Sequence, residues 1–203
     1  MGDGVNDRQE ATSTGRRSLL MAAAALALPA AARAKTPGEV EIGQTLREAQ
    51  LDGLNGKPRP LTSFRGKPLI INVWASWCGP CRAEMASLER LAWSGQAGQA
   101  QLIGISTDDY RDKALAWLKA SNATISHYID HRLELENMLG ASQLPLTILV
   151  DARGRVLAKV YGAQEWDSPA AVQMITRSFG GQGDGKGGSK TSSKTSDKGT
   201  PAR

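Results

Sequence analysis

The feature that most constrains the fold is an apolar segment, residues 69–74, that runs almost directly into the motif Trp77-Cys78-Gly79-Pro80-Cys81. A short segment that is apolar on both faces is typical of a strand at the centre of a sheet covered by helices. Residues 82–91 then supply good helix formers, with apolar positions three or four apart. We therefore expect a buried strand, a bend and a helix, with the only two cysteines of the 203-residue chain at the start of that helix.

The spacing of the two cysteines predicts a redox-active dithiol. Cys78 is expected at the helix N-terminus, where unpaired N–H groups and the macrodipole stabilise a thiolate and lower the pKa of the thiol. Cys81, one turn later, is expected to be the more buried thiol. A thiolate that attacks a disulfide forms a mixed disulfide, which a second thiol within reach can resolve. Cys78 is thus the predicted nucleophile and Cys81 the predicted resolving cysteine.

Two other interpretations of the cysteine pair are open. A purely structural disulfide would close a loop of four residues and gain only about 2 kcal/mol in the chain-entropy model. A Cys2His2 zinc site would combine the pair with His127 and His131, but 45 residues separate the two halves, where zinc fingers use about 12–15. We expect both histidines at the surface or at helix caps rather than as metal ligands.

Residues 73–85, Val-Trp-Ala-Ser-Trp-Cys-Gly-Pro-Cys-Arg-Ala-Glu-Met, resemble the active site of the thioredoxin superfamily, and within it the exported TlpA/ResA/CcmG-type thiol-disulfide oxidoreductases. The resemblance extends over residues 46–179. It implies an α/β thioredoxin-like fold, a central mixed β-sheet with helices on both faces and an N-terminal strand extension. It also implies that Trp77, Gly79 and Pro80 contact the substrate, and that neither a cofactor nor a metal is needed.

The same resemblance draws attention to two polar residues near the cysteines. Asn72 occupies the position where thioredoxins proper carry a buried aspartate that moves protons for the second cysteine, and an amide cannot do this. Glu84 stands where the TlpA/ResA/CcmG branch often places an active-site glutamate, and a partly buried carboxylate with a raised pKa suits proton transfer to Cys81. The alternative for Glu84 is an ordinary solvated helix residue. Ala86 replaces a proline of the family, which predicts a straighter helix.

Residues 143–147, Gln-Leu-Pro-Leu-Thr, form the second functional marker. By resemblance, the Leu144–Pro145 bond is cis and lies beside the dithiol. Leu144 would then present backbone groups to an extended substrate segment, and Pro145 would shield the cysteines. The alternative is a trans proline that opens an edge strand.

The remaining segments predict the order β-β-α-β-α-β-α-β-β-α in one domain. Asp151 to Gly154 should form a hairpin turn, and Ser168 followed by Pro169 is a typical helix start. The expected strands cover residues 46–51, 69–74, 101–106, 126–129, 146–150 and 155–161. The expected helices cover residues 79–91, 108–120, 131–139 and 169–179, and Gly140 ends the third of them. Residues 61–64 are expected to form a short connector.

The chain ends predict export. Arg16-Arg17, an apolar run at residues 19–32 and Ala32-Arg33-Ala34 are the parts of a secretory signal, with features of the twin-arginine type. We therefore assign residues 1–34 to a signal peptide, 35–45 to a linker, 46–179 to the thioredoxin-like domain and 180–203 to a basic tail expected to be disordered. A retained N-terminal anchor is the alternative to cleavage.

The function expected from these features is that of a periplasmic thiol-disulfide oxidoreductase, acting as a monomer that reduces disulfides in client proteins. Residues 35–179 carry 16 basic and 15 acidic residues, so the domain offers no basic surface for nucleic acid. The resemblance implies a membrane thiol reductase of the DsbD/CcdA type as electron donor, and clients in cytochrome c maturation or copper-oxidase assembly. The alternatives are a thiol peroxidase, whose Thr-x-x before the cysteine is missing here, and a Cu(I)-binding metallochaperone domain.

Overall fold

The computed structural model describes residues 36–180. The predicted signal peptide, 1–34, and all of the predicted tail except Gly180 lie outside the described residues. Among residues 36–180, none of the helices is long and apolar enough to cross a bilayer.

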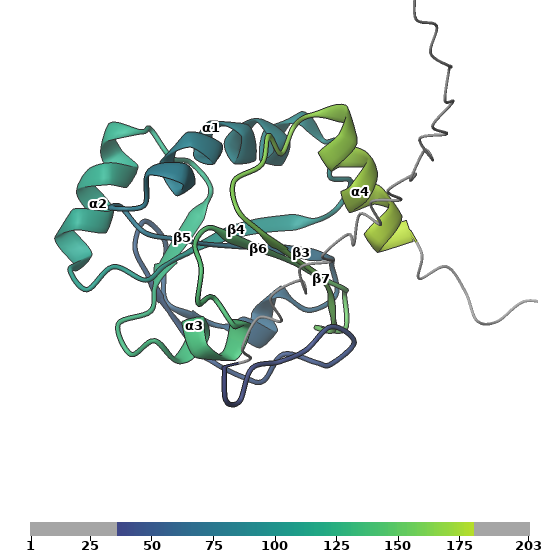
Figure 1. Cartoon of the computed structure of the whole chain (residues 1–203), viewed down its shortest axis with the longest axis horizontal. Helices are drawn as coiled ribbons and strands as arrows, with labels where there is room; N and C mark the ends of the chain where they lie inside the picture. The colour runs from purple at the N-terminus through teal and green to yellow at the C-terminus, as the bar shows by residue number, and fades with distance from the viewer. Residues whose placement is uncertain (1–35, 181–203) are drawn as a thin grey trace, which may run out of the picture. The chain divides into compact units, whose positions relative to one another are not determined.

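A seven-stranded mixed sheet forms the centre of the domain (Figure 1), in the order β2-β1-β5-β4-β3-β6-β7. The central strand β3 pairs with β4 in parallel and with β6 in antiparallel orientation, and all six of its residues are buried. This confirms the buried strand that the apolar segment predicts. The strands are β1 (Gln50–Gly53), β2 (Arg59–Pro60), β3 (Leu69–Trp74), β4 (Gln101–Ser106), β5 (Ser126–Ile129), β6 (Leu146–Val150) and β7 (Val156–Tyr161).

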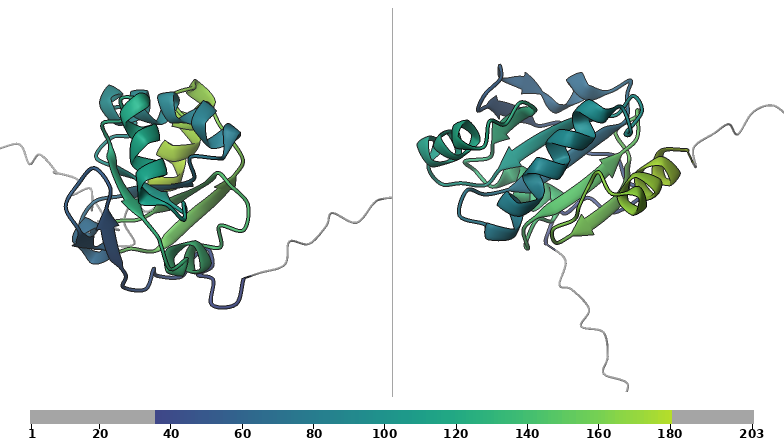
Figure 2. Two further views of the ribbon diagram at one scale, coloured as in Figure 1. Left: turned by 90° about the vertical axis from the view of Figure 1, so that its left-hand side faces the viewer. Right: turned by 90° about the horizontal axis from the view of Figure 1, so that it is seen from above.

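Helices cover both faces of this sheet, as Figures 1 and 2 show. Helices α1, α2 and α4 pack over one face, and α3 with the short helix η1 covers the other. Each face has its own core, because the side chains of a strand alternate between the two sides: Ile70 and Trp74 pack with the first group, Ile71 and Val73 with the second. The helices are η1 (Leu61–Phe64, 3-10), α1 (Gly79–Ser94), α2 (Arg111–Ala120), α3 (Glu134–Leu139) and α4 (Pro169–Gly180).

Three expected elements begin three or four residues later than predicted, two because of a tertiary hydrogen bond and one because of the local backbone conformation. The second helix begins at Arg111 rather than at 108, since the Asp108 carboxylate accepts hydrogen bonds from Ser76 and Ser106. The third begins at Glu134 rather than at 131, because Leu133 has a left-handed backbone with φ of 55°. The first strand begins at Gln50 rather than at 46, because the Leu46 N–H bonds to Gly154 O instead.

Other local signals act as expected. Gly140 ends α3 with φ of 74°, a conformation open to glycine without a steric cost. Ser168 Oγ accepts the Ala171 N–H at the start of α4, directly before Pro169. The Asp151 carboxylate accepts the N–H groups of residues 153 and 155 within the turn between β6 and β7.

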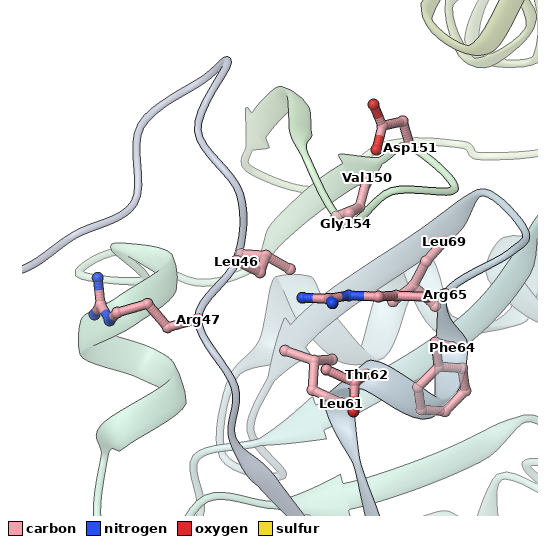
Figure 3. A pocket seen from close by; sticks show the side chains of 10 residues that line it. All are labelled: Leu46, Arg47, Leu61, Thr62, Phe64, Arg65, Leu69, Val150, Asp151 and Gly154. Atoms are coloured by element: carbon pink, nitrogen blue, oxygen red, sulfur yellow. The ribbon is translucent and has the colours of Figure 1, made fainter.

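A small apolar pocket lies at the start of β3, whereas the two cysteines follow the end of that strand. Figure 3 shows the Arg65 side chain extending into it toward Leu46, while Arg47 points away. The pocket contains no cysteine, so it is separate from the dithiol. Its lining residues are Leu46, Arg47, Leu61, Thr62, Phe64, Arg65, Leu69, Val150, Asp151 and Gly154.

Candidate active site

The two cysteines lie at the N-terminus of α1. Cys78 is the N-cap residue, and its Sγ accepts the Cys81 N–H at 3.2 Å. The two sulfurs form a disulfide, with the Cα atoms 5.3 Å apart. Cys78 is 6% exposed and Cys81 is fully buried, which is the difference in burial that the sequence predicts. A free thiolate on Cys78 would occupy a position where a helix N-terminus stabilises negative charge.

The bend before Cys78 is held by an acidic residue that the sequence analysis places only in a helix. Asp108 is 3% exposed. Its two carboxylate oxygens accept the Ser76 N–H at 2.9 Å, the Ser76 hydroxyl at 2.6 Å and the Ser106 hydroxyl at 2.7 Å. The Thr107 N–H also bonds to Trp74 O at 2.9 Å. The end of β4 therefore fixes the segment that leads into Cys78.

A groove of about 680 Å³ opens beside the disulfide. Four of the predicted substrate-contact residues line it, whereas Cys81 and Pro145 are buried and do not line it. Its charged lining residues, Asp109 and Glu136, are both acidic. Burial, and to a smaller extent the negative charge of Asp130, raises the pKa of Glu136. Trp77 stands 70% exposed at its edge. The lining residues are Trp77, Cys78, Gly79, Pro80, Thr107, Asp109, Leu133, Glu136, Ala141, Ser142 and Leu144.

The Leu144–Pro145 peptide bond is cis, as the resemblance implies, and the trans alternative is wrong. Pro145 precedes β6, which pairs on both sides with β3 and β7, so it does not open an edge strand. The Pro145 carbonyl accepts the Gly162 N–H at 2.9 Å. Leu144 is half-buried, packs against both cores and lines the groove.

Glu84 is buried in α1, only 2% exposed, so the solvated alternative is wrong. Burial raises the pKa of its carboxyl group, against the opposing effect of three hydrogen-bond donors. Oε1 accepts Asn72 Nδ2–H at 2.7 Å, and Oε2 accepts the Gln164 N–H at 3.1 Å and Trp166 Nε1–H at 3.0 Å. A carboxyl group with a raised pKa in a dry site can exchange a proton near neutral pH.

Trp166 is a partner of Glu84 that no sequence pattern indicates. It is fully buried, yet it follows β7 in a segment that carries no helix or strand pattern. The one available signal is that a lone tryptophan in a connecting segment needs a partner for its N–H when it is buried. The contact itself cannot be read from spacing, because 82 residues separate the two side chains.

His127 corrects a further expectation, since it lies neither at the surface nor at a helix cap. It is fully buried in β5, edge-on to Trp74, and burial lowers its pKa to about 3. His131, in contrast, is exposed. Within residues 36–180, no group of three or more His, Cys, Asp or Glu side chains is arranged to hold a metal ion, so the residues considered for a Cys2His2 site do not come together.

Comparisons with known proteins agree with this site. A family model described as AhpC/TSA matches residues 42–165. The thiol:disulfide interchange protein DsbE of Vibrio cholerae is 35% identical over 65% of this chain and 73% of its own length. The thiol-disulfide oxidoreductase ResA of Geobacillus thermodenitrificans is 28% identical over 61% of this chain and 71% of its own.

A solved structure supports the fold. The crystal structure from Chlorobium tepidum of a protein described as a DsbE-type thiol:disulfide interchange protein superposes with a TM-score of 0.63. The alignment covers 69% of this chain and 99% of that one, at 24% identity. At this identity, the likeness concerns the arrangement of the sheet and helices.

Proposed function

From the premise that this chain belongs to the AhpC/TSA family and is a thiol-disulfide oxidoreductase, we propose that it reduces disulfides in exported client proteins through Cys78 and Cys81. The observation that carries the proposal is the position of Cys78. Its Sγ caps α1 and lies in the wall of a groove, with the buried Cys81 directly behind it.

The reaction begins with attack by Cys78. In the reduced protein, its thiolate attacks one sulfur of a client disulfide, so that a Cys78–client bond forms while the client bond breaks and one client thiolate leaves. Cys81 then loses its proton, and its thiolate attacks Cys78 Sγ. The mixed disulfide breaks, the Cys78–Cys81 bond forms and the second client thiolate leaves. The client has gained two electrons, and the protein has reached the oxidised form seen here.

Glu84 is the proposed proton acceptor for Cys81. The carboxyl group is buried, and its hydrogen-bond donors, which are Asn72, Trp166 and the Gln164 backbone, carry no charge. A carboxyl group with a raised pKa binds a proton more readily than an exposed one, so it can take the thiol proton and return it to a client thiolate. Glu84→Gln should therefore slow the second step while leaving the first unchanged.

The groove is the proposed client site. Trp77, Gly79 and Pro80 would contact the chain on either side of the client cysteine, and the backbone of Leu144 would pair with it in an extended conformation. Pro145, behind Leu144, would keep other chains away from the sulfurs.

The proposed setting is the periplasm, with residues 1–34 as the export signal, 46–179 as the working domain and 180–203 as its tail. Export is proposed from the signal-like pattern of residues 16–34. The electron donor of the DsbD/CcdA type and the clients from cytochrome c maturation or copper-oxidase assembly rest on the sequence resemblance, and the proposed state is a monomer. Gly79-Pro80 between the cysteines favours a reductant, because it is the dipeptide of reducing thioredoxins.

The test uses a synthetic peptide with one Cys-x-x-Cys disulfide as the client. Cys81→Ala should stop at a mixed disulfide between Cys78 and the peptide, visible as a mass increase that a reductant removes, and the matched control Cys78→Ala should form none. Equal trapping in both variants would contradict the proposed roles.

Two further measurements separate the alternatives. Consumption of hydrogen peroxide by the reduced protein, faster than its reaction with the peptide, would favour a peroxidase. Stoichiometric Cu(I) on the reduced protein that is lost in Cys78→Ala, without any peptide reduction, would favour a metallochaperone. A redox potential as oxidising as that of DsbA would reverse the proposed direction.

A further inference from the structure

The segment between β7 and α4 brings a tryptophan against the buried carboxylate of α1. Trp166 is fully buried and held at both ends: its N–H donates to Ser87 Oγ at 3.0 Å, and its indole Nε1–H donates to Glu84 Oε2 at 3.0 Å. Ser87 in turn donates its hydroxyl hydrogen to Glu84 O at 2.7 Å. The indole orientation is therefore set by two contacts with the same turn of α1.

The two oxygens of Glu84 differ in how many donors they meet. Oε2 accepts two hydrogen bonds, from Trp166 and from the Gln164 backbone, whereas Oε1 accepts one, from Asn72. An ionised carboxylate offers about two acceptor sites on each oxygen. Oε2 is thus fully occupied, and the acceptor site that stays open is on Oε1.

Oε1 has no second donor beside Asn72 among the described residues. Asn72 Nδ2 donates both to Glu84 Oε1 and to Thr147 Oγ1 at 3.0 Å, while Asn72 Oδ1 is buried without a hydrogen-bond partner among the described residues. A buried acceptor without a donor is unfavourable, because it has lost its hydrogen bonds to water without replacement. A proton that arrives on this side of the carboxylate enters a site where acceptors outnumber donors.

We propose that Trp166 is a positioning residue for proton transfer, which holds Oε2 so that Glu84 takes up and releases its proton at Oε1, beside Asn72. This inference rests on the proposed role of Glu84. When Cys81 attacks the mixed disulfide, its thiol proton passes to Oε1, and the same proton leaves from Oε1 to solvent or to a client thiolate. Trp166 contacts neither sulfur in this scheme and acts only through Glu84.

The groups that bond to Glu84 are neutral, so a change in the pKa of Glu84 on removal of the indole N–H can be measured. Besides Trp166, they are Asn72 from β3 and the Gln164 backbone from the segment before α4, and neither titrates. From α1, the neutral Ser87 hydroxyl bonds to the Glu84 backbone carbonyl. The two cysteines pack in the same core as Trp166, and His127 lies edge-on to Trp74 of that core. Because the indole N–H stabilises the ionised form, its removal should raise the pKa of Glu84 further.

The experiment compares Trp166→Phe with a variant that carries benzothienylalanine at position 166, which replaces the N–H by sulfur and keeps the shape of the ring. Trp93→Phe is the matched control, since it removes an indole N–H that donates to Thr124 Oγ1 at 2.7 Å rather than to Glu84, from a side chain that is 73% exposed. One readout is the 13C NMR titration of the Glu84 carboxyl carbon. The other is the pH dependence of the second, concentration-independent release of thionitrobenzoate when the reduced protein reacts with Ellman's reagent, because that step reports attack by Cys81.

Both position-166 variants should shift the carboxyl titration and the acidic limb of the second step upward by about one pH unit. Trp93→Phe should shift neither. An unshifted titration with benzothienylalanine would overturn the inference. Glu84→Gln distinguishes this failure from failure of the proposed function. If Glu84→Gln leaves the rate of the second step and its pH profile unchanged, the role of Glu84 is refuted. If Glu84→Gln loses the acidic limb while the position-166 variants show no shift, only the role of Trp166 is refuted.

Discussion

Glu84→Gln should change how the stability of the protein depends on pH. The ordinary pKa of a glutamate is 4.5, and burial raises that of Glu84 in the folded state. Between these two values the folded protein holds a proton that the unfolded chain has released. The free energy of unfolding must therefore fall as pH rises through this window, by up to about 1.4 kcal/mol per pH unit. The neutral amide of glutamine removes that slope.

The structure indicates that glutamine fits without loss of the network. Its carbonyl oxygen can accept the two donors now at Oε2, from Gln164 and Trp166. Its amide group then needs an acceptor where Asn72 Nδ2 now donates. Asn72 Oδ1 is buried without a partner among the described residues, so a half-turn of the Asn72 amide supplies one. We expect the variant to be at least as stable as the wild type above the raised pKa.

The measurement is urea unfolding of the oxidised protein from about pH 4 to about pH 9, for wild type and variant side by side. The pKa values of Asp130 and Glu136 are also raised by burial, but their contributions cancel in the difference between the two proteins. The difference should grow in favour of the variant as pH rises, and then level off. Two parallel curves over the whole range would refute the argument, because they would mean that Glu84 has the same proton affinity in the folded and unfolded states.

Three other predictions concern the rest of the domain. Burial lowers the pKa of His127 from 6.5 to about 3, so its contribution to stability should be complete above the unfolded pKa and be lost as pH falls toward the folded pKa. The NMR signals of its ring should not titrate between about pH 5 and pH 8, and a midpoint near 6.5 would contradict its burial. Gly104→Ala should lower the free energy of unfolding by about 1–3 kcal/mol, because the new Cβ would clash with His127 Nδ1. Gly79→Ala, whose new Cβ meets nothing within 4 Å, should change this free energy little. Equal losses for the two variants in urea unfolding would contradict the steric cause. Glu39→Ala should lower the free energy of unfolding by about 3–5 kcal/mol in the same assay, because it leaves the buried ammonium of Lys159 without this carboxylate. The double variant with Lys159→Met should recover part of this loss. A double variant no more stable than Glu39→Ala would show that the ion pair is not the cause.

The parts of the fold that the sequence predicts are those written in neighbouring residues. The apolar run of β3, the helix start at Cys78, the glycine that ends α3 and the cap of α4 each depend on a few consecutive positions, and all are found. Two of the boundaries that fail, at residues 108 and 46, depend on hydrogen bonds to distant segments. The third, at residue 131, depends on the left-handed backbone of Leu133 and on the Asp130 carboxylate, which accepts the N–H groups of Glu134 and Glu136. Propensity favours these positions only weakly, and one such bond is enough to override it.

The chemistry divides along the same line. The sequence by itself determines which groups can react: two sulfurs one helical turn apart, at the end of a buried strand, with a proline before β6 and a carboxyl group one turn after Cys81. Only the tertiary structure decides that this carboxyl group is dry, that its pKa is raised, and that Asn72 and Trp166 divide its two oxygens between them. The physical reason is that burial and long-range hydrogen bonds belong to the packed domain, in which segments more than eighty positions apart exclude water from one another, and no local pattern records that proximity.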